Sequence, residues 1–220
     1  MEKKIKLPKL ADILLTLIGV ALCGIGTGFA NCAALGLDAI GILYDGVRNV
    51  LGLSSEALGI ASFIVSAVII LFLFIVKRKY VSFGTLIYVV GYSACISVGN
   101  GIHHFVTGGR EDLWIRIIFS VVGFMLLYVG LSIYVAVDIG VDAFTGLVLY
   151  LRDVTKMELK YVKIQFDLVL LVAGALMGGK LGVATLVTMI VAGPILQWLS
   201  TRFQAIYWRC RLKDQKEIAP

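Results

Sequence analysis

The chain has 220 residues, of which 60% are hydrophobic and 15% are charged. Soluble domains are about half apolar and about a quarter charged, so this composition excludes an ordinary soluble protein and indicates helices that cross a lipid bilayer. The net charge of +6 does not point to nucleic acid as a partner, because the basic residues gather between apolar runs, as they do beside anionic lipid. We therefore expect one transmembrane domain over residues 1–220.

Six apolar runs follow a basic lead over residues 1–9, and each is close to the ~20 residues that a membrane-spanning helix needs. The runs cover residues 10–34, 57–76, 81–105, 113–137, 161–178 and 181–203. A basic cytoplasmic tail is expected over residues 206–220. Inside the last run, Gly193-Pro194 predicts a kink or hinge, because proline removes a backbone donor from a helix.

Two amphipathic segments, residues 38–51 and 138–152, are too short to cross ~30 Å of hydrocarbon at ~1.5 Å per residue. Each is introduced by the sequence Gly-x-Asp-Ala, first over residues 36–39 and again over residues 140–143. Irregular backbone at membrane depth is tolerated only where it lines protein or a water-filled cavity. We expect both segments to be re-entrant or broken helices inside the domain.

The two short segments belong to an internal repeat. A shift of 104 residues superimposes identical residues, among them Gly36 on Gly140, Asp38 on Asp142 and Arg48 on Arg152. The first repeat covers about residues 10–105 and the second about residues 113–205. Each repeat has three full spans, and an odd number of spans inverts the second repeat relative to the first. Both termini then lie in the cytoplasm, where most of the Lys and Arg residues gather. The four basic residues expected on the outer side are Arg48, Arg110, Arg116 and Lys180.

An eight-span model, in which the short segments also cross and the repeats are parallel, is the competing topology. It also puts most basic residues inside, so charge alone does not separate the two models. It puts the cationic residues 77–79 outside, however, and its two extra spans would have only about 11–14 residues. We favour an all-α membrane protein with six transmembrane helices in two inverted three-helix repeats, each with a short re-entrant or broken amphipathic helix.

Asp38 and Asp142 are the first candidates for a binding site. Each stands directly before a short helix, where an aspartate caps the helix by accepting hydrogen bonds from backbone N–H groups. An acid near bilayer depth is also expensive and by default marks a functional site, here for a proton or a sodium ion. The two interpretations are compatible.

Asp45 and Arg48, three residues apart in the first short segment, are expected to form a local pair on an exposed face of the helix.

Asp167, in the fifth run, either pairs with Lys163 one helical turn earlier or contributes to a coupling-ion site. Asn31 and Thr145 are further candidates for lining a substrate or ion cavity, although such residues also hydrogen-bond neighbouring helices. We expect no metal site, no cofactor and no enzymatic activity, since the four cysteines form no Cys-x-x-Cys pair and no catalytic signature appears.

These motifs resemble those of the YitT/YczE type of bacterial membrane proteins over about residues 10–205. In that family a Gly-x-x-Pro or Gly-x-Asp-Pro motif follows the first span, a related motif recurs in the second half, and Gly-Gly-x-x-Gly-x-x-Thr and Gly-Pro come near the end. The matching residues here are 36–39, 140–143, 178–185 and 193–194. Alanine replaces the proline at Ala39 and Ala143, and Gly41 and Thr145 stand where many members carry an acid.

The resemblance implies a multi-pass protein of the bacterial inner membrane with a role related to transport. We expect a secondary transporter or permease for a small solute, coupled to protons or sodium, with a midplane site between the two repeats. The alternative is a non-transporting membrane subunit that binds a partner protein or a vitamin-like ligand. In that case the small-residue stripe of the first span would be a partner surface.

Overall fold

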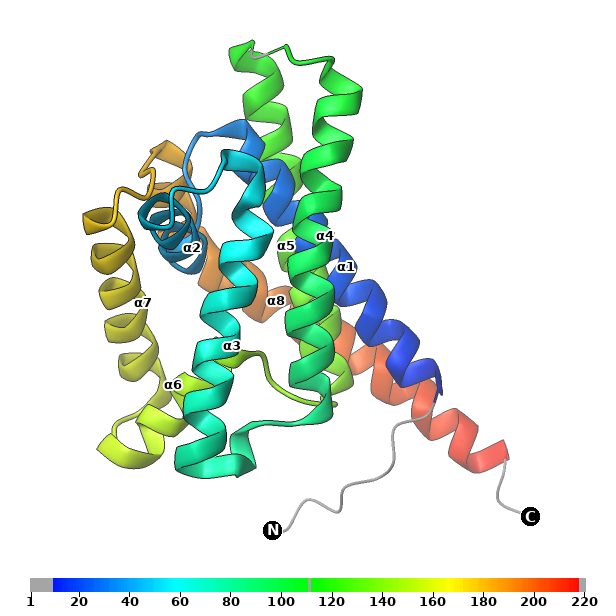
Figure 1. Ribbon diagram of the computed structural model, residues 1–220. Coiled ribbons are helices and arrows are strands. Elements are labelled where there is room, and N and C mark those ends of the chain that lie inside the picture. Colours follow the sequence, from blue (N-terminus) through cyan, green and yellow to red (C-terminus); the bar gives the residue numbers. More distant parts are fainter. Residues whose placement is uncertain (1–9, 111, 218–220) are drawn as a thin grey trace.

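The computed structural model describes residues 10–110 and 112–217, and the side chains of all of these except residues 83 and 210–217. Every regular element in these ranges is a helix (Figure 1). The α-helices are α1 (Leu10–Ala33), α2 (Ala39–Val50), α3 (Leu58–Lys77), α4 (Phe83–Thr107), α5 (Leu113–Val137), α6 (Ala143–Thr155), α7 (Leu159–Leu176) and α8 (Val183–Glu217). Two 3-10 turns flank α3, namely η1 (Ser55–Ala57) and η2 (Arg78–Tyr80). The expected basic lead over residues 1–9 lies outside the described residues.

All six apolar runs are helical, and nearly all of their boundaries lie within about two residues of those predicted. Five of the helices, α1, α3, α4, α5 and α8, are long and apolar enough to cross a membrane. The remaining run, α7, has 18 residues and is not among them, because Lys160, Lys163 and Asp167 dilute its apolar sequence. That α7 crosses the membrane as the sixth span therefore stays a prediction.

The last helix differs from the expectation at its C-terminal end. α8 continues to Glu217, so the segment expected as a basic tail after residue 205 is helical as far as the structure describes it. The helix also continues through Pro194, whose ring removes one backbone hydrogen bond without ending the helix. A hinge role for Gly193 and Pro194 stays a prediction.

Large apolar side chains cover the outside of the molecule, while small polar ones lie within it. Phe105, Leu176 and Ile190 are 89%, 84% and 77% exposed, whereas Thr27 and Ser62 are fully buried between helices. A soluble monomer rarely exposes contiguous apolar surface on this scale, because water would meet it at a large free-energy cost. This distribution of exposed apolar and buried polar side chains is typical of a protein surrounded by lipid, and it supports the assignment of the chain as a membrane protein.

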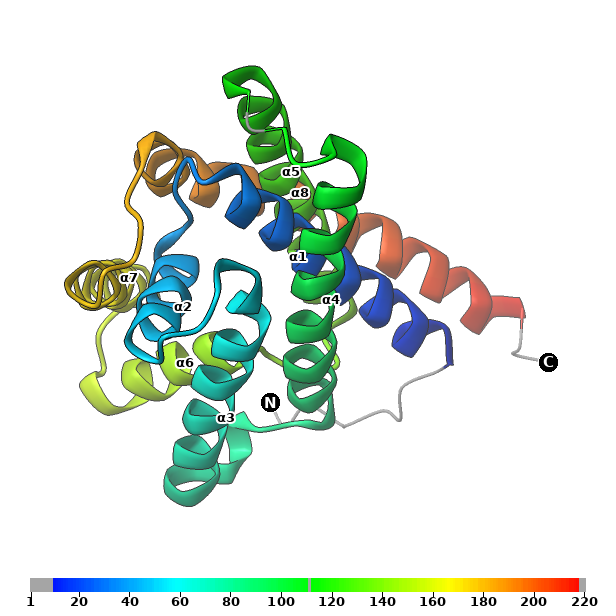
Figure 2. The same ribbon diagram turned by 45° about the horizontal axis from the view of Figure 1, so that its top comes forward.

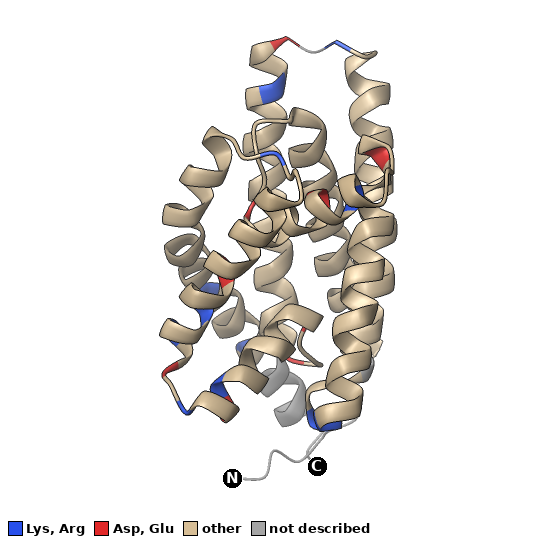
Figure 3. Ribbon diagram, turned by 60° about the vertical axis from the view of Figure 1, so that its left-hand side comes forward, with Lys and Arg blue, Asp and Glu red and all other residues tan. Residues whose placement is uncertain are grey.

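The long helices alternate in direction through the molecule. Figure 1 shows α1, α4 and α7 running one way and α3, α5 and α8 running the other, so α1 begins and α8 ends at the same end of the bundle. Lys and Arg residues are concentrated at the two ends (Figure 3). We refer to the end where α1 begins as the terminal end and to the other as the distal end.

The helices form two groups, and each group takes helices from both halves of the sequence (Figure 2). In the long-helix group, α1 packs between α4 and α5, and α5 packs on α8. In the short-helix group, α2 packs on α3 and α7, and α6 packs on the same two helices; α3 also packs on α4 and so joins the two groups. The halves are therefore interleaved: α2 of the first half lies against α7 of the second, and α6 lies against α3.

Reciprocal glycine contacts bring α1 and α5 together in antiparallel fashion. A Cβ atom on Gly26 would lie 2.4 Å from the carbonyl oxygen of Gly123, and one on Gly123 would lie 2.6 Å from the carbonyl oxygen of Gly26. Gly19 and Gly130 make the corresponding contact, with distances of 2.8 and 2.4 Å. The 104-residue shift that matches Gly19 with Gly123 also matches Gly26 with Gly130. Gly26 therefore contacts Gly123, the counterpart of Gly19, and Gly19 contacts Gly130, the counterpart of Gly26. Only glycine permits this close approach of the two backbones.

Candidate functional site

Asp38 and Asp142 cap the two short helices, as their positions predicted. The Asp38 carboxylate accepts a hydrogen bond from the backbone N–H of Gly41 at 3.3 Å, and the Asp142 carboxylate accepts one from Thr145 at 3.0 Å. The two residues have nearly the same backbone conformation, with φ and ψ of −68° and 171° at Asp38 and −65° and 164° at Asp142. The capping role is confirmed, and an ion-binding role remains a prediction.

The linker before each short helix packs on the start of a long helix from the other half. The carbonyl oxygen of Leu35 accepts a hydrogen bond from the Ala184 N–H at the start of α8, at 3.0 Å. The carbonyl oxygen of Val141 accepts one from the Thr85 hydroxyl at the start of α4, at 2.6 Å. Gly36 allows the first contact, since a Cβ atom there would lie 2.5 Å from Thr185 Oγ1, and its φ of +109° suits glycine. Both short helices are thus fixed at their first turn by the opposite half.

Four tyrosines form a row of adjoining rings in the interior. Ring centroids are 6.4 Å apart for Tyr44 and Tyr92, 5.2 Å for Tyr92 and Tyr88, and 4.8 Å for Tyr88 and Tyr134. Tyr44 lies on α2 in the short-helix group, and the other three lie on α4 and α5 in the long-helix group. This tyrosine row therefore crosses the boundary between the two groups.

The tyrosine row connects the surroundings of the two capping aspartates. Tyr92 lies within electrostatic range of Asp38, Tyr134 lies within range of Asp142, and Tyr44 lies within range of both. The hydroxyl groups at two positions make interhelical contacts, Tyr92 with Thr27 at 2.9 Å and Tyr44 with Ser66 at 3.3 Å. Carboxylates, phenol hydroxyls and aromatic faces are groups that bind small cations or pass protons. These groups lie near the starts of the two short helices, and a cation or proton site there stays a prediction.

Asp167 lies on α7 and forms an ion pair with Lys163, one turn earlier on the same helix. The side chains are 33% and 48% exposed, so the pair lies at the edge of the protein. Asp167 nevertheless lies within electrostatic range of Asp38. The structural interpretation of Asp167 as a partner of Lys163 is confirmed, and its participation in an ion site stays a prediction.

The other predicted residues do not gather at the aspartates. Asn31 lies near the distal end of α1 and donates hydrogen bonds to the Ser55 carbonyl at 3.0 Å and to Asn100 at 3.5 Å. The Thr145 side chain is exposed on the first turn of α6, and Gly193 and Pro194 are exposed on α8. The structure therefore brings together Asp38, Asp142 and the tyrosines, and leaves Asn31 in a separate pocket.

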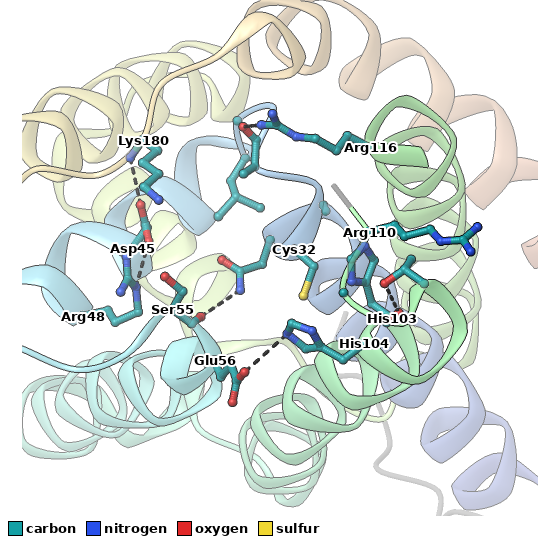
Figure 4. Close-up of a pocket in the computed structure, with 17 residues that line it drawn as sticks. Cys32, Asp45, Arg48, Ser55, Glu56, His103, His104, Arg110, Arg116 and Lys180 are labelled. Atoms are coloured by element: carbon teal, nitrogen blue, oxygen red, sulfur yellow. Dashed lines mark hydrogen bonds and ion pairs between the residues drawn. The ribbon is translucent and has the colours of Figure 1, made fainter. Parts of the chain in front are cut away.

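That pocket, at the distal end, has a volume of about 280 Å³ (Figure 4). Its wall comes from the end of α1, the linker to α2, α2 itself, η1, the end of α4 with its turn to α5, the start of α5, and the loop between α7 and α8. It carries the four basic residues that the sequence analysis assigned outside the cytoplasmic face: Arg48, Arg110, Arg116 and Lys180. We call it the distal pocket. Sequence reasoning identified these residues singly, and their convergence became visible only in three dimensions.

Asp45 and Arg48 form the α2 anchor together with the backbone of Lys180. Asp45 Oδ1 accepts hydrogen bonds from Arg48 Nη2 at 2.6 Å and from Nε at 2.9 Å, and Asp45 Oδ2 accepts one from the Lys180 N–H at 2.8 Å. The sequence predicted the pair on an exposed face of the helix, and this is wrong. Asp45 and Arg48 are 3% and 5% exposed, because the loop between α7 and α8 folds over them from the other half.

Asp153 forms the α6 anchor at the terminal end with Lys79, Tyr80 and Arg152. Its carboxylate accepts hydrogen bonds from Lys79 Nζ at 2.8 Å, from the Tyr80 hydroxyl and from Arg152 Nη2 at 2.7 Å. These donors, Lys79 first, hold the pKa of Asp153 well below its usual range. Lys79 and Tyr80 belong to the segment between α3 and α4, so this anchor also joins a short helix to the opposite half.

Comparison with known proteins gives a family for the chain. A model of the DUF6198 family, a family of unknown function, matches residues 10–201. The chain belongs to this family. An uncharacterized protein from Haemophilus influenzae (strain ATCC 51907 / DSM 11121 / KW20 / Rd) is 23% identical over 186 residues, which cover 84% of this chain and 82% of that protein. No solved structure matches the chain. None of these matches carries the YitT/YczE name, so that resemblance stays a prediction.

Proposed function

We propose that the protein is a secondary transporter for a small solute, with a site near the membrane midplane where α2 and α6 begin. The observation that carries the proposal is this pair of helices: both start inside the bundle on a capping aspartate, and both contact helices of the opposite half. Broken or half-length helices of this kind form substrate and ion sites in secondary transporters, because their ends meet charge in the middle of the membrane.

The proposed architecture has six spans, α1, α3, α4, α5, α7 and α8, in two inverted repeats related by an axis between α1 and α5. The reciprocal glycine contacts support it, since Gly19 contacts Gly130, the counterpart of Gly26, and Gly26 contacts Gly123, the counterpart of Gly19. The contacts of α2 with α7 and of α6 with α3 support it as well, because each short helix packs on a long helix of the opposite repeat. We propose a multi-pass protein of the bacterial inner membrane with both termini in the cytoplasm, in keeping with the YitT/YczE-type resemblance and the basic residues near the termini.

Alternating access requires two bodies that move relative to each other. The interleaved packing makes the long-helix group and the short-helix group better candidates for these bodies than the two sequence halves. The capping aspartates and the tyrosine row lie along the boundary between the groups. A solute or ion bound at this boundary would contact both bodies, which is the arrangement that couples binding to movement.

The proposed coupling ion is a proton or a sodium ion bound near Asp38 and Asp142. Removing their charge without removing the cap gives a sharp test, because asparagine caps helices about as well as aspartate. Purified wild-type protein and the variants Asp38→Asn, Asp142→Asn and Asp38→Asn/Asp142→Asn would be reconstituted in liposomes. Uptake of a panel of small metabolites would be measured under imposed proton and sodium gradients.

We expect gradient-driven uptake of at least one solute by the wild type and its loss in the double variant, with thermal stability retained. Asp112→Asn is the matched control, because Asp112 is exposed and precedes α5 without a side-chain capping bond. Uptake that the double variant performs as well as the wild type would contradict the assignment of the two aspartates. Absence of flux across the whole panel, for solutes and ions alike, would favour the non-transporting membrane subunit instead.

A further inference from the structure

In the distal pocket, charged side chains from several segments converge. Its volume of about 280 Å³ is at the lower end of the range of small-molecule sites. Leu37, the residue before the capping Asp38, forms part of its wall. The pocket thus leads from the distal surface to the linker on which the proposed midplane site depends.

Both acidic side chains of the pocket are already engaged by protein groups. Each oxygen of Asp45 accepts hydrogen bonds, one from Arg48 and the other from the Lys180 N–H. Glu56 Oε1 lies 3.3 Å from His104 Nε2 (Figure 4). Asp45 therefore has little remaining capacity to attract a cation, and the Glu56 side chain is 70% exposed at the mouth of the pocket.

The basic side chains, in contrast, exceed the acidic ones in number and are less fully paired. Arg116 donates from Nε to the Ala33 carbonyl and from Nη2 to the Ala34 carbonyl, both at 2.7 Å. These neutral acceptors leave its positive charge without a carboxylate partner among the residues that the structure describes. The Lys180 ammonium group likewise has no ion-pair partner within the described part of the chain.

A pocket whose basic side chains outnumber its acidic ones, with no carboxylate partner for Arg116 or Lys180 among the described residues, is suited to an oxyanion. Guanidinium and ammonium groups hydrogen-bond carboxylate, phosphate and sulfate oxygens, and these charge-assisted bonds are stronger than neutral ones. Arg116 is also held in place by two carbonyl oxygens, so little conformational freedom is lost when an anion binds.

We infer that the distal pocket binds a small oxyanion, with Arg116 and Lys180 as the principal contacts and Arg110 at its rim. The anionic group defines the substrate class of the proposed transporter: a solute carrying a carboxylate, phosphate or sulfate. Binding itself stands on the pocket, whereas the role of the bound anion as cargo rests on the proposed transport function. The same oxyanion chemistry is present in the phosphate of a lipid headgroup, and the experiment below separates the two sources.

The experiment measures binding of sulfate, inorganic phosphate and succinate to the full chain in phosphatidylcholine nanodiscs. Thermal unfolding is compared with and without each oxyanion at constant ionic strength, with chloride as the reference anion. The test variant is Arg110→Gln/Lys180→Gln, which leaves the carbonyl-bound Arg116 and the α2 anchor intact. The matched control is Lys160→Gln/Arg202→Gln, which removes two exposed basic side chains far from the pocket.

We expect at least one oxyanion to raise the unfolding temperature of the wild type and of the control, and to bind the test variant roughly tenfold more weakly or worse. A parallel arm uses nanodiscs that contain phosphatidylglycerol: if the headgroup is the natural occupant, this lipid raises the unfolding temperature and suppresses the effect of the soluble oxyanions. Stabilisation by a soluble oxyanion and stabilisation by phosphatidylglycerol both support the oxyanion site, and the comparison shows whether the natural occupant is a soluble anion or a lipid headgroup.

Alkylation of Cys32, whose side chain also lines the pocket, gives a readout that needs no variant. A bound oxyanion should slow maleimide labelling of Cys32 and leave that of Cys95, outside the pocket, unchanged. The inference is overturned if neither soluble oxyanions nor phosphatidylglycerol protect Cys32 or stabilise the protein, or if the test variant binds as the wild type does. Flux of a cationic or neutral solute without oxyanion binding would contradict this inference alone, and oxyanion binding without any flux would contradict the transport proposal alone.

Discussion

The anchors of α2 and α6 join corresponding segments of the two repeats, but their acids stand at different repeat positions and their surroundings differ. Each joins a short helix of one half to an interhelical segment of the other, α2 to the loop before α8 and α6 to the segment before α4. The α2 anchor is a buried pair, Asp45 with Arg48, closed by a backbone N–H. The α6 anchor has Asp153 in contact with Lys79, whose side chain is 58% exposed.

This difference indicates how firmly each end of the molecule is closed. A buried charge pair resists separation because parting leaves two unpaired charges inside the protein, whereas an exposed pair exchanges its partners with water and salt. If the two short helices belong to a moving group, the terminal end around α6 should open more readily than the distal end around α2. Three substitutions test this comparison.

The largest effect is expected for Asp45→Asn, which leaves the Arg48 charge buried and unpaired. Removing one partner of a buried pair costs about 3–5 kcal/mol, so the unfolding temperature in detergent should fall steeply. The double variant Asp45→Asn/Arg48→Gln removes both charges and should recover part of the loss. Equal stability of Asp45→Asn and the wild type would show that the α2 anchor contributes no more than a surface pair.

An intermediate effect is expected for Gly26→Ala, which displaces α1 from α5 in the long-helix group and touches neither anchor. The new Cβ atom would lie 2.4 Å from a backbone oxygen of Gly123, and overpacking of this kind costs about 1–3 kcal/mol. Gly101→Ala is the matched control on α4, since no atom lies within 4 Å of a Cβ atom there. The control should be neutral or slightly stabilising, as alanine favours the helix. Equal unfolding temperatures for the two variants would refute the close crossing of α1 and α5.

The smallest effect is expected for Asp153→Asn, and it should depend on pH and salt. The pKa of Asp153 is lowered in the folded protein, so its contribution is complete above the ordinary aspartate value of ~4 and is lost as the pH falls toward the lowered pKa. The variant should therefore be less stable than the wild type near neutral pH, and the two should converge in acid. High salt should also reduce the difference. A difference that persists unchanged in acid and in high salt would contradict an exposed electrostatic anchor.

The sequence predicted the helices and the short segments because those features are local. Apolar runs mark the long helices, and Asp38 and Asp142 cap short helices whose first residues are Ala39 and Ala143. The extent of α8 was less predictable, because the charged sequence after residue 205 is typical of a tail, although the helix continues to Glu217.

The sites could be predicted only in part, since their contacts join residues far apart in the chain. Burial of Asp45 depends on Lys180, 135 residues away, and no local pattern indicates that the loop carrying Lys180 folds over α2. The basic residues of the distal pocket were recognised as lying outside the cytoplasmic face, but their convergence depends on how α2, the α4–α5 turn, α5 and the α7–α8 loop pack together. The tyrosine row likewise joins α2, α4 and α5.

The central claim is that the protein consists of two inverted halves, so that the segments after α2 and after α6 lie on opposite sides of the membrane. The most direct test is the labelling of single cysteines in intact cells, in a variant otherwise free of cysteine. Ser54→Cys and Glu158→Cys are suitable because both residues are exposed at these two segments. The account predicts that a membrane-impermeant maleimide labels Ser54→Cys from outside and reaches Glu158→Cys only after the membrane is opened. Labelling of both positions from the same side would contradict the inverted repeat.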